Sequence, residues 1–265
     1  MVLKDKVAII TGGGKGIGRA IALGFAEEGA AVVVSGRTPS VLEDVARMIR
    51  EKGGQAHTIE TDVSDEQQVE RMVAQTLSTF GRIDILVNNA GIMGPTANVV
   101  DMELADWNET LAINLTGSLL ACKHVLRHMI PRNAGAIVNI GSERGRTGDG
   151  KSGSPMRTPY SCSKAGMIAL TESLSVEVGR YNIRVNCVTP GPVKGERIIN
   201  VLKAKSNVTG ENVDELWNKL VEPFSLRRAA EEEEVAAAAV FLASDKASGI
   251  TGQTLSVTCG QRVLF

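Results

Sequence analysis

Short apolar runs alternate with longer segments in which apolar residues recur at helical spacing, and the alternation continues along the whole chain. Several short runs are rich in Val and Ile and carry no charge, which is typical of strands buried on both faces of a parallel sheet. The longer segments are then the crossover helices between strands. The predicted strands are 7–11, 31–36, 55–60, 84–89, 135–142, 183–190 and 254–258, and the predicted helices are 16–28, 39–52, 65–79, 101–131, 158–180, 196–220 and 231–243.

This order of elements predicts an α/β protein with a doubly wound, seven-stranded parallel sheet and helices on both faces. No stretch of the 265 residues has the composition of a linker, so we expect 1–265 to form a single domain. Sheets of this kind bind ligands outside the carboxyl ends of their strands. The residues that follow each strand are therefore the candidates for a functional site.

Charge and composition narrow the class of partner. The 29 Lys and Arg nearly balance the 30 Asp and Glu, and no basic run is interleaved with aromatic residues, so neither nucleic acid nor a membrane surface is expected as a partner. A small molecule is the expected partner. The N-terminus lacks the pattern of a secretory leader, and the apolar runs are far shorter than the roughly 20 residues of a membrane span, so we expect a soluble cytoplasmic protein. The four cysteines are widely spaced, which predicts neither disulfide nor zinc site.

The first predicted strand ends in TGGGKGIG, and a predicted helix begins at once. Glycines permit a tight turn and a close approach of the backbone to a ligand, and the N–H groups of a new helix attract phosphate. The spacing is TGxxxGxG rather than GxGxxG, but the strand, glycines and helix follow in the order that a dinucleotide site requires. A flexible turn without a ligand is the alternative. The residues expected to line this site are Gly12, Gly14, Lys15, Gly16, Ile17 and Gly18.

Tyr160 and Lys164 are four positions apart on the predicted helix 158–180, so they share one face of it. A fixed positive charge within about 4–6 Å of a tyrosine favours the phenolate, which suits the pair to proton transfer. The same spacing occurs by chance on many helices. The pair gains its significance from the motifs around it.

Five motifs follow one another in a characteristic order. They are TGGGKGIG, NNAG at 88–91, Ser142 after a strand, YSCSK at 160–164 and PGPV at 190–193. In this order and at these distances, the chain resembles the short-chain dehydrogenase/reductase family over nearly its whole length. The resemblance implies one NAD(P)-binding Rossmann-fold domain that transfers hydride between a nicotinamide and a carbonyl or alcohol. A non-catalytic dinucleotide-binding regulatory or scaffold protein, and a sugar epimerase or dehydratase, are the alternatives.

The resemblance also implies roles for four residues. Tyr160 would be the acid/base group, and Lys164 would hold the nicotinamide ribose as well. Ser142 would hydrogen-bond the carbonyl oxygen of the substrate, although a serine at a strand end is also an ordinary turn residue. Asn114 would hold a water that connects the lysine to solvent, although a solvent-facing polar residue is the simpler interpretation.

Further cofactor contacts follow from the same resemblance. Asp62 would bind the adenine amino group, with a turn or N-cap carboxylate as its alternative role. The asparagine-rich segment would line the ribose side, and Val193 would use its backbone for the carboxamide. The full set of these expected contacts is Asp62, Val63, Asn89, Ala90, Gly91, Tyr160, Lys164, Pro190, Gly191 and Val193.

The end of the second predicted strand bears on the choice of cofactor. NAD sites place an acid there to bind the ribose 2′-hydroxyl, whereas NADP sites need cations for the 2′-phosphate. Here Gly36 takes the place of the acid, Arg37 and Thr38 follow it, and Lys15 faces the same region. NADP(H) is therefore the expected cofactor, with NAD(H) as the alternative if both cations are merely solvated.

Two segments depart from the family pattern. The stretch 143–159 is longer than usual, and its Arg144, Arg146, Lys151 and Arg157 outnumber its acids, so we expect a substrate loop that favours a polar or anionic substrate unless it is merely a solvated loop. After PGPV, Gly195 stands where the family often has a threonine that contacts the cofactor. The segment 194–222 would be a substrate lid, on which Trp217 is more simply a packing anchor.

Two remaining features are assigned as follows. His124 and His128 stand at helical spacing, but no third ligand lies near them in sequence, so no metal is expected. By family resemblance, the helices 101–131 and 158–180 pack in a subunit interface. A homotetramer is therefore expected, with a dimer as the alternative.

Overall fold

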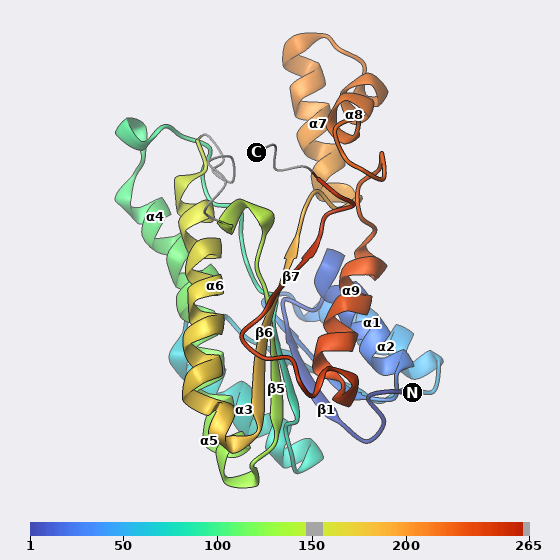
Figure 1. Cartoon of the computed structure of the whole chain (residues 1–265), viewed down its shortest axis with the longest axis vertical. Helices are drawn as coiled ribbons and strands as arrows, with labels where there is room; N and C mark the ends of the chain where they lie inside the picture. Colours follow the sequence, from blue (N-terminus) through green and yellow to red (C-terminus); the bar gives the residue numbers. More distant parts are fainter. Residues whose placement is uncertain (147–155, 262–265) are drawn as a thin grey trace.

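The computed structural model of the chain describes residues 1–146 and 156–261, without the side chains of residues 197, 204, 205 and 208. Its centre is one seven-stranded sheet in the order β3-β2-β1-β4-β5-β6-β7 (Figure 1). All neighbouring strands in it are parallel. The strands are β1 (Val7–Thr11), β2 (Ala31–Gly36), β3 (Ala56–Glu60), β4 (Ile85–Asn88), β5 (Gly135–Ile140), β6 (Ile183–Pro190) and β7 (Thr254–Val257). The predicted fold class is confirmed, and the strand boundaries differ from the prediction by at most two residues.

Helices cover both faces of the sheet because the central strands are apolar on both sides. Ile10 points to one face, where it joins a core with side chains of α1 (Gly16–Glu27), α2 (Pro39–Glu51) and α9 (Glu232–Ala243). Ile9 points to the other, where it joins a core with α3 (Glu66–Phe80), α5 (Gly117–Met129) and α6 (Thr158–Val178). Both isoleucines are completely buried. Consecutive strand residues thus anchor the two layers of helices.

The predicted helix 101–131 is wrong as a single regular helix. It begins with α4 (Leu104–Leu111), passes through a π-helical turn, η2 (Ala112–Thr116), and continues as α5. The turn places Asn114 in the interior, where it is completely buried. The solvent-facing interpretation of Asn114 is therefore wrong, and the widened turn is a local deviation that serves a buried polar side chain.

The predicted helix 196–220 is likewise two helices, α7 (Glu196–Thr209) and α8 (Val213–Val221). Gly210 ends α7 in the left-handed conformation with φ +74°, and the Asn212 side chain accepts a hydrogen bond from the Asp214 N–H at 2.7 Å to start α8. Both helices project beyond the carboxyl ends of the strands (Figure 1). Trp217 packs with Phe224 and Ala229 at their base, as a packing anchor would.

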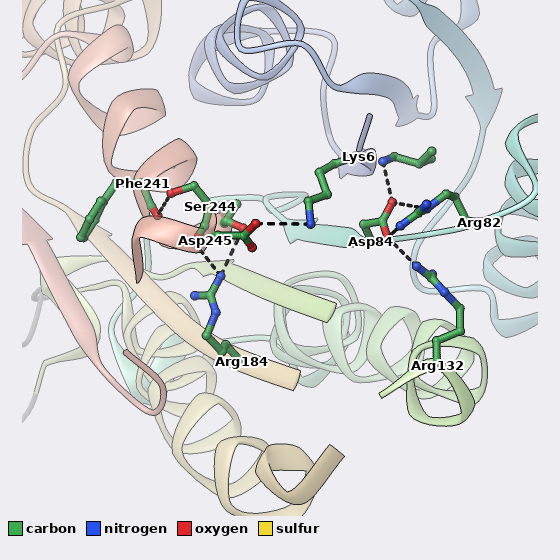
Figure 2. A network of polar contacts seen from close by, with 10 residues as sticks. Lys6, Arg82, Asp84, Arg132, Arg184, Phe241, Ser244 and Asp245 are labelled. Atoms are coloured by element: carbon green, nitrogen blue, oxygen red, sulfur yellow. Dashed lines mark hydrogen bonds and ion pairs between the residues drawn. The ribbon is translucent and has the colours of Figure 1, made fainter. Parts of the chain in front are cut away.

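Charged residues bind the strands together at the amino end of the sheet (Figure 2). Asp84, which is 6% exposed, accepts hydrogen bonds from the Val7 N–H at 2.9 Å, from Arg82 at 2.7 and 2.8 Å, and from Arg132 at 2.6 Å. Burial alone would raise the pKa of Asp84, but the hydrogen bonds from Arg82, Arg132 and the Val7 N–H outweigh it, so the pKa lies below its usual value. At this end of the sheet the buried carboxylate is therefore fully paired with hydrogen-bond donors from the protein itself.

Arg184 plays a similar part at the start of β6. Its guanidinium donates to the carbonyl oxygens that end α9, those of Leu242 at 2.6 Å, Ala243 at 3.2 Å and Ser244 at 2.9 Å. A cation at a helix C-terminus satisfies the last carbonyls and complements the helix dipole. Helix α9 is thereby fixed to the sheet at its C-terminal end.

The helices within the described ranges are each too short or too polar to span a membrane.

Candidate active site

The loops after β1 and β4 meet at the carboxyl end of the sheet, where the strand order reverses. Thr11, which the sequence analysis did not single out, holds them together: its hydroxyl donates to the Val87 carbonyl at 3.2 Å and accepts from the N–H groups of Asn89 and Ala90 at 3.0 and 3.1 Å. Asn89 returns two hydrogen bonds to the carbonyls of Thr11 and Gly12, both at 3.0 Å. The predicted glycine turn and the NNAG segment therefore form one rigid unit.

The glycine turn at residues 12–18 is packed so closely that side chains at Gly12 and Gly18 would collide with neighbouring atoms. Gly12 adopts φ +63°, and a Cβ on it would lie 2.9 Å from Ala90 Cα. A Cβ on Gly18 would collide with the Gly12 carbonyl oxygen and the Asn89 side chain. Lys15 is the N-cap residue of α1 but makes no side-chain cap hydrogen bond, and no acid stands in the first turn of the helix. This glycine cradle at an uncapped helix N-terminus fits the diphosphate of a dinucleotide.

The end of β2 lies beside this cradle. A Cβ on Gly36 would be 3.9 Å from Gly12 Cα. Arg37, Thr38 and Lys15 are exposed there, and neither cation makes a hydrogen bond or ion pair with a described residue. The two predicted phosphate-binding cations are thus available to a ligand.

Asp62 has the turn role that was its alternative. Its carboxylate accepts from the Ser64 N–H at 2.9 Å and the Ser64 hydroxyl at 2.6 Å, while Asp65 caps α3 through the N–H groups of Gln67 and Gln68. The side chain of Val63 is buried against α5, where a Cβ on Gly117 would lie 2.7 Å from it. A cofactor contact at Val63 is therefore left to its backbone.

Tyr160, Lys164 and Asn114 come together at the start of α6. The Lys164 Nζ lies 5.9 Å from the centre of the Tyr160 ring and donates to the Ile140 carbonyl at 2.8 Å. Asn114 accepts from the Ile92 N–H at 2.7 Å and donates to the Ile92 carbonyl at 2.9 Å. A Cβ on Gly91 would lie 3.1 Å from the Asn114 carboxamide oxygen and 3.7 Å from the Lys164 ammonium, so the NNAG segment borders both.

Ser163 is a second residue that the sequence analysis missed. It is completely buried, accepts from the Asn114 amide at 3.0 Å and donates to the Tyr160 carbonyl at 2.8 Å. The hydroxyl therefore ties the π-helical turn to the backbone of Tyr160. The sequence could have pointed to Ser163, because it lies next to Lys164 within YSCSK and a hydroxyl buried there must form hydrogen bonds.

Ser142 follows β5 and is 8% exposed. Its hydroxyl accepts from the Arg144 N–H at 3.2 Å and so starts the short helix η4 (Glu143–Gly145), a turn role that the sequence analysis considered. A Cβ on Gly145 would collide with the backbone of Lys164. The segment after Ser142 therefore lies directly on α6, at Lys164.

The PGPV segment is held from two sides. The Gly191 N–H donates to the Val257 carbonyl at 3.0 Å, and the Ala230 N–H donates to the Pro192 carbonyl at 3.2 Å. Val193 pairs with Ala230 in a parallel bridge. Pro190, Gly191 and Val193 therefore lie at the same end of the sheet as the glycine cradle.

Two further expectations concern the substrate loop and the histidine pair. Most of the predicted substrate loop, 147–155, lies outside the described residues. His124 contacts the Glu66 carboxylate at 3.1 Å, His128 is exposed, and within the described ranges no three potential metal ligands form a group.

Comparisons with known proteins complete the picture. Residues 12–262 match the family model described as Enoyl-(Acyl carrier protein) reductase. The cis-4-hydroxycyclohexanecarboxylate dehydrogenase of Sinomonas cyclohexanicum is 40% identical over 97% of this chain and 96% of that protein. A crystal structure of NAD⁺-bound xylitol dehydrogenase matches with a TM-score of 0.90 and 34% identity, over 98% of this chain and 100% of that one. A single-substitution variant of actinorhodin polyketide ketoreductase with NADPH matches with a TM-score of 0.90 and 32% identity, over 97% of each chain.

Proposed function

Since the chain belongs to the short-chain dehydrogenase/reductase family of NAD(P)-dependent oxidoreductases, we propose that it interconverts a carbonyl and a secondary alcohol, with Tyr160 as the acid/base group and NADP(H) as the preferred cofactor. The observation that carries the proposal is the convergence of Tyr160, Lys164 and Asn114 at the carboxyl end of the sheet, next to the glycine cradle. The bound nicotinamide would supply or accept the hydride. All other steps fall to side chains of the chain itself.

Tyr160 exchanges a proton with the substrate oxygen in this proposal. The Lys164 ammonium favours the phenolate after the proton has left, and it has the position to do so from above the ring. Asn114 is fixed by Ile92 on one side and Ser163 on the other. Its role is to keep the lysine connected to solvent, so that protons are replenished between turnovers.

Ser142 would donate a hydrogen bond to the substrate oxygen, where negative charge develops as hydride reaches the carbon. Its hydroxyl oxygen accepts from the Arg144 N–H, which leaves the hydroxyl proton for the substrate. The Lys164 bond to Ile140, two residues before Ser142, supports this arrangement because it ties the serine segment to the same helix as Tyr160.

The cofactor preference rests on the chain's own residues, because similar structures hold NAD⁺ in one case and NADPH in another. Gly36 offers no carboxylate to a ribose 2′-hydroxyl. Arg37 and Lys15 have no partner among the described residues and lie near the cradle. A 2′-phosphate would pair with both.

The substrate class follows from charge at the site. The similar dehydrogenase from Sinomonas is named for a substrate with a hydroxyl and a carboxylate. Arg146 follows η4; its guanidinium is nearly half exposed and lies 2.5 Å from the Ser256 hydroxyl and 3.9 Å from the Glu143 carboxylate. We therefore favour a small anionic substrate, and unchanged substrate preference after charge reversal at Arg144 and Arg146 would argue against it.

Assembly and location extend the same proposal. Leu119 on α5 and Val176 on α6 are 46% and 84% exposed, and buried apolar contacts between subunits would cover them. This supports a homo-oligomer, with a tetramer favoured over a dimer. We place the protein in the cytoplasm.

The decisive test is Tyr160→Phe. It should lower kcat by about a thousandfold because general acid/base catalysis is lost, while NADPH binding stays within about twofold. Tyr181, the other tyrosine of the chain, supplies the matched control, and Tyr181→Phe should keep its activity. The assay follows reduced-nicotinamide absorbance with a panel of ketones and alcohols, NADP(H) and NAD(H) in parallel. Substantial turnover by Tyr160→Phe would overturn the assignment, and nucleotide binding without turnover of any substrate would favour the scaffold alternative.

A further inference from the structure

A carboxyl group lies between the glycine cradle and the start of the lid. Glu232 is the first residue of α9, and its Oε1 lies 3.6 Å from the position of a Cβ on Gly16 and 2.7 Å from that of a Cβ on Gly195. Gly16 opens α1 in the cradle, and Gly195 precedes α7. The carboxyl therefore occupies the space beside Gly195 in which a larger residue would place its own side chain.

Glu232 has no hydrogen bond or ion pair with a described residue, in contrast to the acids beside it. Glu231 lies 3.4 Å from the Lys194 ammonium, and Glu234 accepts two hydrogen bonds from the Arg228 guanidinium, both at 2.7 Å. Glu233 is exposed. Glu232 alone among the four is partly buried without a partner, and a buried charge is costly unless it is paired.

Burial raises the pKa of Glu232, and the charge of Arg19 on α1 opposes the shift, while Glu233 and Glu231 add to it. Further charged residues adjoin the two glycines in sequence: Lys15 precedes Gly16, and Lys194 and Glu196 flank Gly195. The balance favours the neutral acid more than in an exposed glutamate.

The carboxyl is held in this place by the backbone. The Lys194 N–H donates to the Ala230 carbonyl at 2.7 Å, and the Ala230 N–H donates to the Pro192 carbonyl at 3.2 Å. The capping box between Glu231 and Glu234 fixes the first turn of α9. These bonds fix the backbone from which the Glu232 side chain extends toward the cradle.

We propose that Glu232 is a proton-linked residue of the dinucleotide site, whose carboxyl faces the diphosphate and takes up a proton when the dinucleotide binds. This inference rests on the proposed placement of the cofactor in the glycine cradle. A diphosphate at the N-terminus of α1 brings a second anion toward a carboxylate that forms no ion pair with any described residue. The neutral acid removes this repulsion and can donate a hydrogen bond to a phosphate oxygen. Dinucleotide affinity therefore falls as pH rises through the range in which Glu232 loses its proton.

The test measures binding of NADP⁺ by calorimetry between about pH 5.5 and pH 8.5, in buffers that differ in ionisation enthalpy. The wild-type protein should bind about tenfold more weakly at the upper end, which corresponds to a shift of one pKa unit on binding, and should take up protons. Glu232→Gln should bind several-fold more tightly at high pH and lose the proton uptake. Glu233→Gln, one residue further along the same helix turn, is the matched control; it should keep the proton uptake, displaced slightly to lower pH because the charge of Glu233 adds to the raised pKa of Glu232.

Titration of the 2′-phosphate contributes equally to all variants, so the difference between Glu232→Gln and Glu233→Gln is the readout. Glu232→Ala provides a second variant, which should also lose the proton uptake. If Glu232→Gln keeps the pH dependence and proton uptake of the control, the inference is overturned and the cofactor site stands. If the wild-type protein binds neither NADP⁺ nor NAD⁺, the proposed function itself fails.

Discussion

The two ends of the sheet use charged residues in opposite ways. At the amino end, Asp84 receives hydrogen bonds from two arginines and a backbone N–H, and Arg184 is shared among three carbonyls (Figure 2). At the carboxyl end, Arg37 and Lys15 have no partner among the described residues. At the amino end these charges hold strands and helices together, whereas at the carboxyl end the two cations remain available for the proposed cofactor.

The comparison teaches that stability and binding are separable in this molecule. A buried carboxylate needs its partners to remain buried, so loss of one partner acts on folding. An exposed cation without a partner contributes little to folding, so its loss acts on binding alone. Substitutions at the amino end should therefore lower stability, whereas substitutions at the carboxyl end should lower cofactor affinity.

Asp84→Ala should give the largest effect. It removes the acceptor for Arg82, Arg132 and the Val7 N–H, and should lower the free energy of unfolding by about 2–4 kcal/mol, as expected for charged hydrogen bonds at a largely buried site. Urea unfolding followed by circular dichroism measures it. Asp44→Ala, which breaks the exposed ion pair with Arg47, is the control and should change little. A matching loss of NADP⁺ affinity in folded Asp84→Ala would break the comparison.

The double substitution Lys15→Ala and Arg37→Ala should act at the other end. We expect NADP⁺ affinity to fall roughly tenfold to a hundredfold, because two charge-assisted contacts to the 2′-phosphate are lost. NAD⁺ affinity and the unfolding free energy should stay unchanged. Calorimetric titration with both nucleotides measures the split. An equal loss for NADP⁺ and NAD⁺ would show that the cations do not recognise the 2′-phosphate.

Lowering the pH should have a smaller effect, a partial loss of stability through protonation of Asp84. The folded-state pKa of Asp84 lies below that of the unfolded chain, so its contribution to stability is complete above the unfolded value near 3.9 and is lost as pH falls through the folded value. Urea unfolding between about pH 3 and pH 7 should show a decline below about pH 4 that Asp84→Asn reduces. An identical slope in both proteins would assign the decline to other carboxylates.

Much of the fold was accessible from the sequence because several strands, such as β1 and β4, are short apolar runs between segments of helical period. The interruption of the predicted helix 101–131 was not, since the π-helical turn exists to bring Asn114 to Ile92 and Ser163, which are distant in the sequence. The break at Gly210 was accessible in principle, because a glycine followed by the N-cap Asn212 is a typical boundary between helices.

In the candidate site, too, residues in local sequence patterns were found and residues that act through long-range contacts were missed. Tyr160 and Lys164 were found from their spacing on one helix, and the glycine cradle from its position after a strand. Thr11 and Ser163 were missed because each acts through a hydrogen bond between segments that only the fold brings together. Glu232 lies in the predicted helix 231–243, but nothing in the sequence puts it beside Gly16 and Gly195.

Helix α9 is fastened at both ends, by Arg184 beneath it and by the backbone bonds of Ala230 above it. It therefore works as a strut on one face of the sheet, below the two helices that project above the site (Figure 1). Displacement of α7 and α8 cannot be absorbed by tilting this strut. If the segment 194–222 acts as the expected substrate lid, it would turn about the short link at Gly195 while the wall behind the cradle stays in place.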